Sequence, residues 1–421
     1  MTAFRFVHTA DLHLDSPFVG LQEVNDQVAS ELREATFRTF DRIVDLCLER
    51  AADFLLVAGD VYDARDRSLR AQLRFRDGLK RLSDAGIASF VVHGNHDPLN
   101  RWSATLEWPE QAHFFGARGV TSVPVVRDGE TIAHVYGISY ATQDVRRNLA
   151  TKFRRNDDGP FAIGLLHCNV GDDTGHDPYA PCTLADLIQV GMDYWALGHV
   201  HNHQVLSHEG PTIVYPGNPQ GRNPRELGPR GCYVVEIDAG GHPTAEFVPM
   251  DTVRWFWESV PIEQLETDEA LIAAVEGACQ RMREQAEGRP SLGRIGLTGR
   301  GPAHRSLVRP GFVTELLDSV RATQEGEDPF VWVERLEVDT RPPIELDERR
   351  SGQDFVGDFL GLVAGYREDP KQVDSLRTHL EPLYLSQRAH PLLDAPTDHE
   401  LREWLDAAEA MCLDLLTAED D

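Results

Sequence analysis

The sequence predicts an α/β protein in which residues 1–250 form one domain, followed by a small α+β unit and an acidic helical segment. Two observations predict the first domain: short apolar runs have the length of buried strands, and five of them end in polar residues. These runs cover residues 4–7, 54–57, 90–92, 163–166 and 194–197. Ligands gather at the carboxyl ends of strands in open α/β sheets, so we expect the polar residues at one edge.

The polar residues after these runs offer carboxylate, imidazole and one carboxamide, and no thiolate. They are Asp11, His13, Asp60, Asp63, Asn95, His96, Asp97, His167, His199 and His201. This chemistry suits hard or borderline divalent ions such as Mn²⁺, Mg²⁺ or Fe²⁺, and argues against a closed structural zinc site. Two adjacent metals that share one carboxylate clamp both the attacking and the leaving oxygen of a phosphoryl displacement. The sequence therefore predicts metal-assisted phosphodiester hydrolysis.

Each motif alone has a plain structural explanation, because Gly-Asp turns are common and a single buried histidine is more often a hydrogen-bonded core residue. Five separate segments that deliver polar residues to the same edge are difficult to explain as packing. The conjunction, in this order, favours a functional site.

These five motifs, in this order, resemble the calcineurin-like metallophosphoesterase superfamily. Residues 8–14 and 198–201 resemble more narrowly its SbcD-type nucleases of double-strand-break repair, and residues 14–18 resemble the YhaO-like branch. The motif match covers roughly residues 4–250. The resemblance implies a two-sheet sandwich flanked by helices, with a small α+β capping domain and a C-terminal helical segment.

The resemblance also implies a ligand set for two divalent metal ions, Mn²⁺ above all, with Mg²⁺ or Fe²⁺ as alternatives. One metal would be held by Asp11, His13, Asp60 and His201. The other would be held by Asp60, Asn95, His167 and His199, so that Asp60 bridges the two ions.

The same resemblance assigns the proton transfer to His96, which would protonate the leaving oxygen, with Asp97 orienting it. Asp63 stands where some nucleases of this branch carry His, so a direct substrate contact does not carry over to it. Three further histidines lie in these segments, and we expect structural hydrogen bonding from them: His8, His93 and His203.

The net charge of −28 is unusual for a protein that binds DNA, because phosphate contacts dominate nucleic-acid affinity. Local basic clusters exist nevertheless. Residues 65–81 contain seven basic and two acidic residues and follow the second motif, so Arg65, Arg67 and Arg70 are candidates for substrate contact. Further clusters lie within residues 146–155 and 222–230. The alternative for each cluster is a solvated surface.

Length and composition fit a cytoplasmic protein that has reduced cysteine thiols and more than one domain. The 421 residues exceed what one hydrophobic core usually serves. The six cysteines show no CxxC spacing and are expected as free thiols. No apolar stretch approaches the roughly 20 residues of a membrane span, and the chain runs from Met1 directly into the first expected strand, without a signal peptide.

The second half of the chain predicts two further parts. Residues 253–345 alternate strand and helix patterns in the order β-α-β-α-β, as expected of the capping domain. Residues 346–421 are acidic and contain three helical patterns, the last with an amphipathic face at 398–416. That face either closes the protein's own core or binds a partner. The resemblance implies that this partner is an SMC-like coiled-coil ATPase of the SbcC type. A homodimer of the protein is a further possibility.

These observations predict a divalent-metal-dependent DNA nuclease that acts on DNA ends or structured DNA in repair, with exonuclease activity expected. Two alternatives stay open. One is a metallophosphoesterase of small substrates, and the other is a non-catalytic DNA-binding scaffold, for which a degenerate site would be expected.

Overall fold

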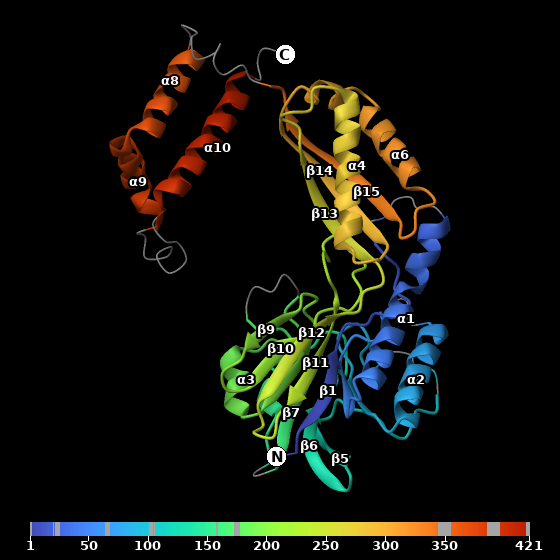
Figure 1. Cartoon of the computed structure of the whole chain (residues 1–421). Coiled ribbons are helices and arrows are strands. Elements are labelled where there is room, and N and C mark those ends of the chain that lie inside the picture. The colour runs from blue at the N-terminus through green and yellow to red at the C-terminus, as the bar shows by residue number, and fades with distance from the viewer. Residues whose placement is uncertain are drawn as a thin grey trace. The chain divides into compact units, whose positions relative to one another are not determined.

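The structure is a computed structural model that describes most of the chain. The described residues are 2–343, apart from 20, 22–25, 64–67, 101–103, 105, 157–158 and 172–176, together with 355–384 and 396–417. The chain divides into two compact units, Met1–Thr340 and Arg341–Asp421 (Figure 1).

Two six-stranded mixed sheets form the centre of the first unit, which confirms the expected two-sheet sandwich. The strands of the first sheet are, in spatial order, β12 (Pro243–Pro249), β11 (Gly231–Ile237), β1 (Phe4–Thr9), β2 (Phe54–Ala58), β3 (Ala88–Val92) and β4 (Ala112–Phe114). Those of the second are β5 (Thr121–Arg127), β6 (Glu130–Gly137), β7 (Phe161–His167), β8 (Tyr194–Gly198), β10 (Thr212–Tyr215) and β9 (Gln204–Ser207).

The five strands that carry the motifs run parallel to one another within each sheet. β1, β2 and β3 pair in parallel in the first sheet, and β7 and β8 pair in parallel in the second. Because parallel strands end at the same edge, the polar residues that follow each strand gather there. The apolar runs at the start of these segments are buried between or beneath the sheets, which explains why they fold as strands.

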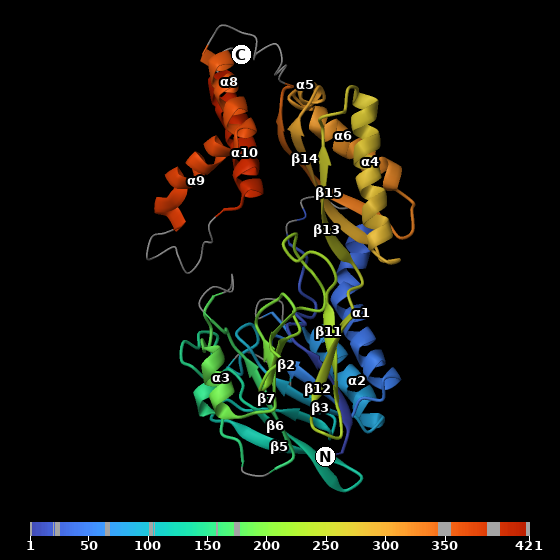
Figure 2. The ribbon, with the colours of Figure 1, turned by 60° about the vertical axis from the view of Figure 1, so that its left-hand side comes forward.

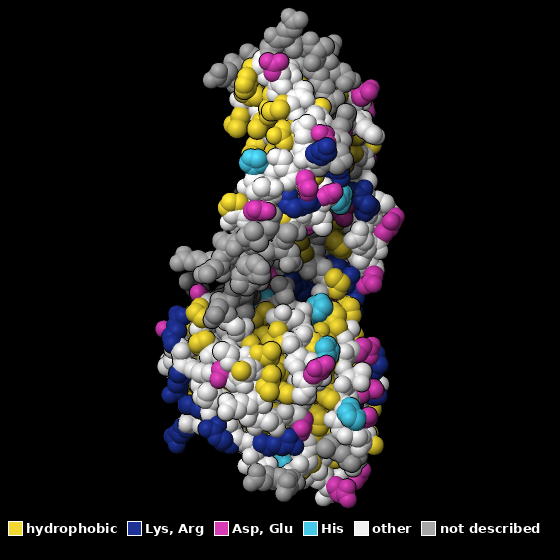
Figure 3. Space-filling view, turned by 90° about the vertical axis from the view of Figure 1, so that its left-hand side faces the viewer, with side chains coloured by type: hydrophobic (Ala, Val, Ile, Leu, Met, Phe, Trp, Pro, Cys, Tyr) yellow, Lys and Arg dark blue, Asp and Glu magenta, His cyan; other side chains and the backbone are white. Residues whose placement is uncertain are grey.

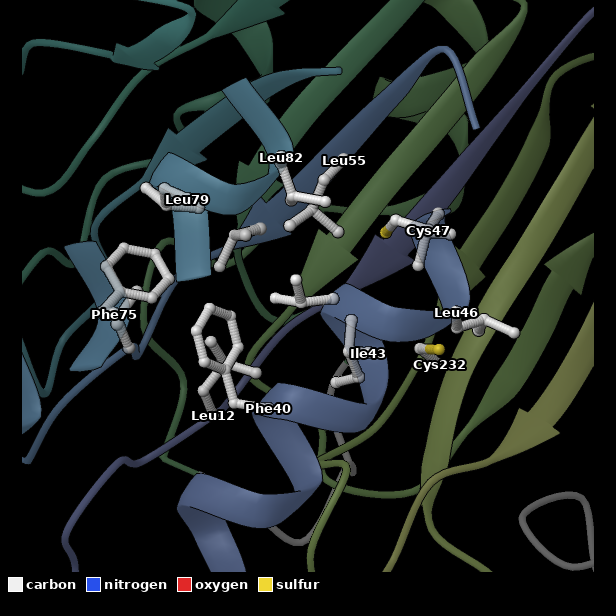
Figure 4. Packing of buried hydrophobic residues seen from close by; sticks show 14 of the residues in the cluster. Leu12, Phe40, Ile43, Leu46, Cys47, Leu55, Phe75, Leu79, Leu82 and Cys232 are labelled. Carbon is white, nitrogen blue, oxygen red and sulfur yellow. The ribbon is translucent and has the colours of Figure 1, made fainter. Parts of the chain in front are cut away.

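Helices cover the outer face of each sheet (Figures 1 and 2). α1 (Asp26–Glu49) and α2 (Leu69–Asp84) pack on the first sheet, and Figure 4 shows Phe40 and Ile43 of α1 against Leu79 and Leu82 of α2. The second sheet is covered by the short helix α3 (Leu184–Val190) and the 3₁₀ turn η1 (Ala150–Lys152). The two sheets bury a third apolar cluster between them.

The capping region has one three-stranded sheet with helices on one face, which confirms the expected β-α-β-α-β order. Its elements are β13 (Arg254–Pro261), α4 (Asp268–Gln285), β14 (Ser291–Arg300), α5 (His304–Leu307), α6 (Phe312–Gln324) and β15 (Val331–Arg341). The single-turn helix α5 was not expected from the sequence.

Helix α1 is shared between the two-sheet sandwich and the capping region. Its first half places Val28 and Leu32 in an apolar cluster with Trp255, Leu292 and Phe330 of the capping region. Its second half belongs to the cluster beneath the first sheet. One helix therefore packs on both parts of the first unit, which explains why they form a single compact body.

The described part of the second unit contains three helices, α8 (Phe355–Glu368), α9 (Pro370–Tyr384) and α10 (Asp398–Thr417). The expected capping box of α10 is present, because Thr397 and Glu400 exchange side-chain and backbone hydrogen bonds. The expected apolar face is divided: Leu401 is buried, whereas Trp404 is 53% and Leu415 72% exposed. None of the helices in the described part of the chain combines the length and apolarity needed to cross a membrane.

Candidate metal centre

The first two motifs are joined through their backbones at the carboxyl ends of β1 and β2. The amide of Asp11 donates to the carbonyl of Gly59 at 3.0 Å, and the amide of His13 donates to the carbonyl of Asp60 at 3.1 Å. These bonds continue the strand pairing beyond the sheet edge. They bring the side chains of both segments to one place, although about fifty residues separate them in the sequence.

Four candidate ligands have positive φ angles, which are unusual for residues other than glycine. They are Asp11 (52°), His13 (44°), Asp60 (51°) and His199 (105°). Such conformations cost roughly 1–3 kcal/mol each and persist where the surrounding structure enforces them, commonly at functional sites. The backbone therefore turns sharply after each strand and directs the polar side chains inward.

Gly94 precedes the Asn95 motif because no side chain fits at its position. A Cβ there would lie 2.3 Å from Oδ1 of Asp60 and 2.7 Å from Nε2 of His167. The backbone thus approaches the candidate ligands directly, which only glycine permits.

One half of the centre is formed by Asp11, His13 and His201, whose ligand atoms lie within 4.8 Å of one another. Nδ1 of His13 lies 3.0 Å from Oδ1 of Asp63, and Nδ1 of His201 lies 2.7 Å from Oε1 of Glu226. A carboxylate only accepts hydrogen bonds, so each Nδ1 carries the proton and each Nε2 keeps its lone pair for a metal.

The other half is formed by Asp11, Asp60 and His167, again with ligand atoms within 4.8 Å of one another. Nδ1 of His167 donates to the carbonyl of Ala58 at 2.9 Å, which leaves Nε2 without a proton in the neutral ring. That Nε2 lies 2.9 Å from Oδ1 of Asn95 and 3.3 Å from Oδ2 of Asp60. Three electron-pair donors therefore converge.

His199 lies beside this half, directly after the end of β8. Its amide donates to Oδ2 of Asp11 at 3.0 Å, and its Nε2 lies 2.8 Å from the carbonyl oxygen of Asp177. Its ring also packs edge-on against the ring of His167, with centroids 5.2 Å apart. The structure thus brings the ligand atoms of five expected ligands together, places Asn95 beside His167, and brings His199 to them through its amide and its ring.

The residues fit a pair of divalent ions on the chemistry of the donors alone. Nε2 of His13 is fully buried and has no hydrogen-bond partner among the described residues, although a buried nitrogen without a partner is costly. Bound metal at this position would satisfy it. The donors are carboxylate and amide oxygens and imidazole nitrogens, the set that Mn²⁺, Mg²⁺ and Fe²⁺ accept.

The electrostatics of the centre reflect the same crowding of polar groups. Burial would raise the pKa of Asp60, but His167, His96 and His13 outweigh burial and hold that pKa well below its usual range. Burial lowers the pKa of His13, and Arg222 lowers it further, which favours the neutral imidazole that binds a metal. Burial also lowers the pKa of His167, but the charge of Asp60 and the hydrogen bond to it raise this pKa to about 9, so a metal bound there would displace a proton.

The carboxylate beside His96 is Asp63, whereas the sequence predicted Asp97. Nδ1 of His96 lies 2.6 Å from Oδ1 of Asp63. Asp97 instead accepts hydrogen bonds from the amides of Gly94 and Val61, and its Oδ2 lies 3.1 Å from Nδ1 of His93. The side chain of Asp97 turns back into its own loop, so the expected contact with His96 is replaced by a loop-stabilising role.

The other histidines of these segments make structural contacts. Nδ1 of His8 lies 3.0 Å from the hydroxyl of Tyr194, and burial lowers the pKa of His8 to about 3. The ring of His203 stacks on Phe247 with centroids 3.9 Å apart. Cys168, next to His167, is buried beside Cys182 at 3.8 Å between the sulfur atoms.

The basic residues expected to contact substrate have a different environment. Arg65 and Arg67 lie outside the described residues. Arg70 binds Glu34 at 2.5 Å, and its guanidinium lies over the ring of Phe37. Arg70 is therefore neutralised by α1, which agrees with the alternative of a solvated helix face.

Two polar residues of the centre were not identified from the sequence. Glu226 fixes His201 as described, and its other oxygen accepts the amide of Arg222 at 2.6 Å. The guanidinium of Arg222 donates to Oδ2 of Asp63 at 3.0 Å. Both residues follow the last motif in a loop without periodic pattern, so the sequence offered only the charge cluster at 222–230 as a signal.

Comparison with known proteins matches both parts of the first unit. Residues 4–203 match the family model described as calcineurin-like phosphoesterase, and residues 255–341 match that of the metallophosphoesterase YhaO middle domain. The chain is 37% identical over 346 residues to a Bacillus subtilis protein named uncharacterized metallophosphoesterase YhaO, which covers 82% of this chain and 84% of that protein.

More distant matches name a repair protein and a phosphatase. The chain is 27% identical over 227 residues to the DNA double-strand break repair protein Mre11 of Aeropyrum pernix, covering 51% of this chain and 53% of that protein. Among solved structures, a dimetal phosphatase from Danio rerio matches with 10% identity and a TM-score of 0.36, covering 58% of this chain and 99% of that one.

Proposed function

Because the chain belongs to the calcineurin-like phosphoesterase family and carries a YhaO-type middle domain, we propose that it is a two-metal nuclease that hydrolyses phosphodiester bonds of DNA. The family makes the protein a metal-dependent phosphoester hydrolase. The observation that carries the finer proposal is the convergence of five ligand side chains, with the unpartnered Nε2 of His13 among them and Asn95 beside His167. The five are Asp11, His13, Asp60, His167 and His201.

We assign the ligands to two ions that share Asp60. The first ion is held by Asp11, His13, Asp60 and His201, and the second by Asp60, Asn95, His167 and His199. The two groups of ligand atoms that lie within 4.8 Å support the separation of His13 and His201 from His167, with Asp11 common to both groups. The sharing of Asp60 is taken from the resemblance of the motifs. Mn²⁺ is the ion that we expect, and the donor set equally admits Mg²⁺ and Fe²⁺.

When bound, the ions supply Lewis-acid stabilisation of the charge that develops on the scissile phosphate. The chain itself supplies the proton for the departing oxygen. The side chain of His96 is 45% exposed, whereas the histidine ligand His13 is fully buried. Asp63 holds Nδ1 of His96, so the other nitrogen, Nε2, is free to donate outward to the leaving group.

The choice of DNA as substrate is supported by the likeness to the Aeropyrum pernix protein Mre11, which is named as a DNA double-strand break repair protein. We place the activity at DNA ends or structured DNA in repair, with exonuclease action. The resemblance of the motifs to SbcD-type nucleases is the basis for an SMC-like coiled-coil ATPase of the SbcC type as partner. The second unit, with its exposed Trp404 and Leu415, is the part that we assign to that contact.

End-labelled DNA tests the proposal. Purified protein should shorten labelled duplex, hairpin or single-stranded DNA in Mn²⁺ and lose this activity in a chelator. Turnover of a small chromogenic phosphodiester with all three DNAs left intact would reject the nuclease and favour a phosphoesterase of small substrates. DNA binding without hydrolysis of either substrate would favour the non-catalytic scaffold.

A further inference from the structure

The basic side chains of this acidic protein fall into two groups that differ in their partners. On α2, the described lysine and arginine side chains each bind a carboxylate. The pairs are Arg70 with Glu34, Arg74 with Asp41, Arg76 with Asp77, Lys80 with Asp84 and Arg81 with Asp45. The positive charge of α2 is thus neutralised locally, mostly by α1.

The segment before η1 and through it behaves differently. Arg147 and Lys152 have no carboxylate partner among the described residues, and Arg154 donates only to the neutral carbonyls of Thr151 and Phe153. Arg147 and Arg154 are exposed and Lys152 is half-buried. Three positive charges therefore remain uncompensated on the described surface of a chain whose net charge is −28.

The backbone that carries these cations is held firmly by apolar anchors. Val145, Leu149, Ala150 and Phe153 are buried in the cluster beneath the second sheet. Because these residues point inward, the side chains between them are presented outward on an ordered segment. Binding through such a segment costs little additional ordering of the backbone.

The start of the segment is connected to the metal centre through the ring of Tyr179, and the rest of it contacts both ends of α3. The guanidinium of Arg146 lies 5.0 Å from the ring centroid of Tyr179, and that ring packs edge-on against His199 at 5.8 Å. Asn148 then donates to Asp186 in the first turn of α3, and Arg155 donates to the carbonyl of Gly191 after its last turn.

We propose that Arg147, Lys152 and Arg154 form a phosphate-binding track for the DNA strand that leaves the metal centre past Arg146 and Tyr179. The proposal rests on the proposed nuclease function and adds the path of the substrate. The seven residues of α3 span about 10 Å, which corresponds to roughly three nucleotides of one strand. Figure 3, which views the molecule from the side of α3, shows Lys and Arg side chains gathered over the catalytic sandwich.

A salt titration separates the track from the overall charge. The track variant is Arg147→Gln, Lys152→Gln and Arg154→Gln, and the matched control is Arg74→Gln, Lys80→Gln and Arg81→Gln on α2. Each variant loses three positive charges, but only in the track variant are these charges without a carboxylate partner among the described residues. Fluorescence anisotropy of labelled DNA in Ca²⁺, with circular dichroism to confirm folding, measures the affinity of each protein over a range of salt concentration.

We expect the slope of log affinity against log salt to fall by about 2 to 3 in the track variant, because each phosphate contact contributes roughly 0.7–0.9 to it. The control should change the slope by less than about 1. Equal losses in both variants, or an unchanged slope in the track variant, would overturn the proposal. Weakened binding to polyglutamate with unchanged binding to DNA would also overturn it and assign this surface to an acidic protein.

Cleavage of the same labelled DNA in Mn²⁺ by the wild-type protein tests the proposed function separately. If the protein binds DNA through the track residues but does not cleave it, the proposed track is retained and the proposed nuclease function is rejected. If the protein cleaves DNA but its affinity for DNA does not depend on the track residues, the nuclease function is retained and the proposed track is rejected.

Discussion

Oδ1 of Asp63 lies 2.6 Å from Nδ1 of His96 and also 3.0 Å from Nδ1 of His13. One carboxylate therefore orients both the proposed proton donor and a proposed metal ligand. Burial would raise the pKa of Asp63, but the hydrogen bonds from His13 and His96 and the charge of Arg222 hold it well below its usual range. Asp63 thus stays ionised and links proton transfer to metal binding.

The replacement Asp63→Asn tests this link. The amide keeps the shape but removes the charge, so both imidazoles lose their charged partner. We expect a metal affinity that is about 10–100-fold weaker, and a kcat that falls even when metal is saturating. Metal titration and steady-state kinetics measure the two effects, and a change in only one of them would show that the shared carboxylate does not couple the two histidines.

The replacement His96→Asn tests the proton donor through the leaving group. A sugar alkoxide needs protonation as it departs, whereas nitrophenolate leaves readily without it. We expect DNA cleavage to fall by about 10²–10⁴-fold. Hydrolysis of a nitrophenyl diester should fall much less, with the metal content unchanged. Equal losses on both substrates would instead indicate that His96 binds the phosphate.

The pH dependence of DNA cleavage follows from the same residue. Burial lowers the pKa of His96, but the hydrogen bond to Asp63 and the charges of Asp60 and Asp63 raise it to about 9. The imidazole is thus protonated at neutral pH, as an acid must be, and bound cations near Asp60 would only lower this value. The rate profile should therefore descend at or below pH 9, and this descending limb should be absent from His96→Asn.

A single substitution at Glu226 tests how the orientation of His201 affects metal binding. The carboxylate of Glu226 fixes the ring of His201, and the hydrogen bond from His201 together with the charge of Arg222 lowers the pKa of Glu226 against the effect of burial. Glu226→Gln should weaken metal binding about 10–100-fold. Excess Mn²⁺ should restore most of the activity, which calorimetric titration and kinetics can verify. Activity that stays lost at saturating metal would assign Glu226 a different role.

The sequence was sufficient to predict the strands and their polar ends, because both signals are local. Each apolar run is long enough for one buried strand, and the ligands follow directly after it. The pairing of His96 was not predictable in this way. Asp97 is its neighbour in the sequence, yet its side chain is used to close the Gly94 turn, and the partner comes from the loop after β2.

Long-range contacts also explain the other differences. Glu226 reaches His201 from a loop 25 residues away. The neutralisation of α2 by α1 depends on how two helices pack, so the charge cluster at 65–81 alone could not reveal it. The sequence of helix α1 likewise gives no signal that the helix packs on both the sandwich and the capping region, because its apolar positions contribute to both clusters.

Anomalous scattering from crystals grown with Mn²⁺ would locate the metal ions themselves. We expect two peaks about 3.5–4 Å apart, with Asp60 between them, one beside His13 and His201 and the other beside His167 and His199. A single peak, or two peaks that do not share Asp60, would contradict the two-metal centre from which the proposed hydrolysis of DNA is derived.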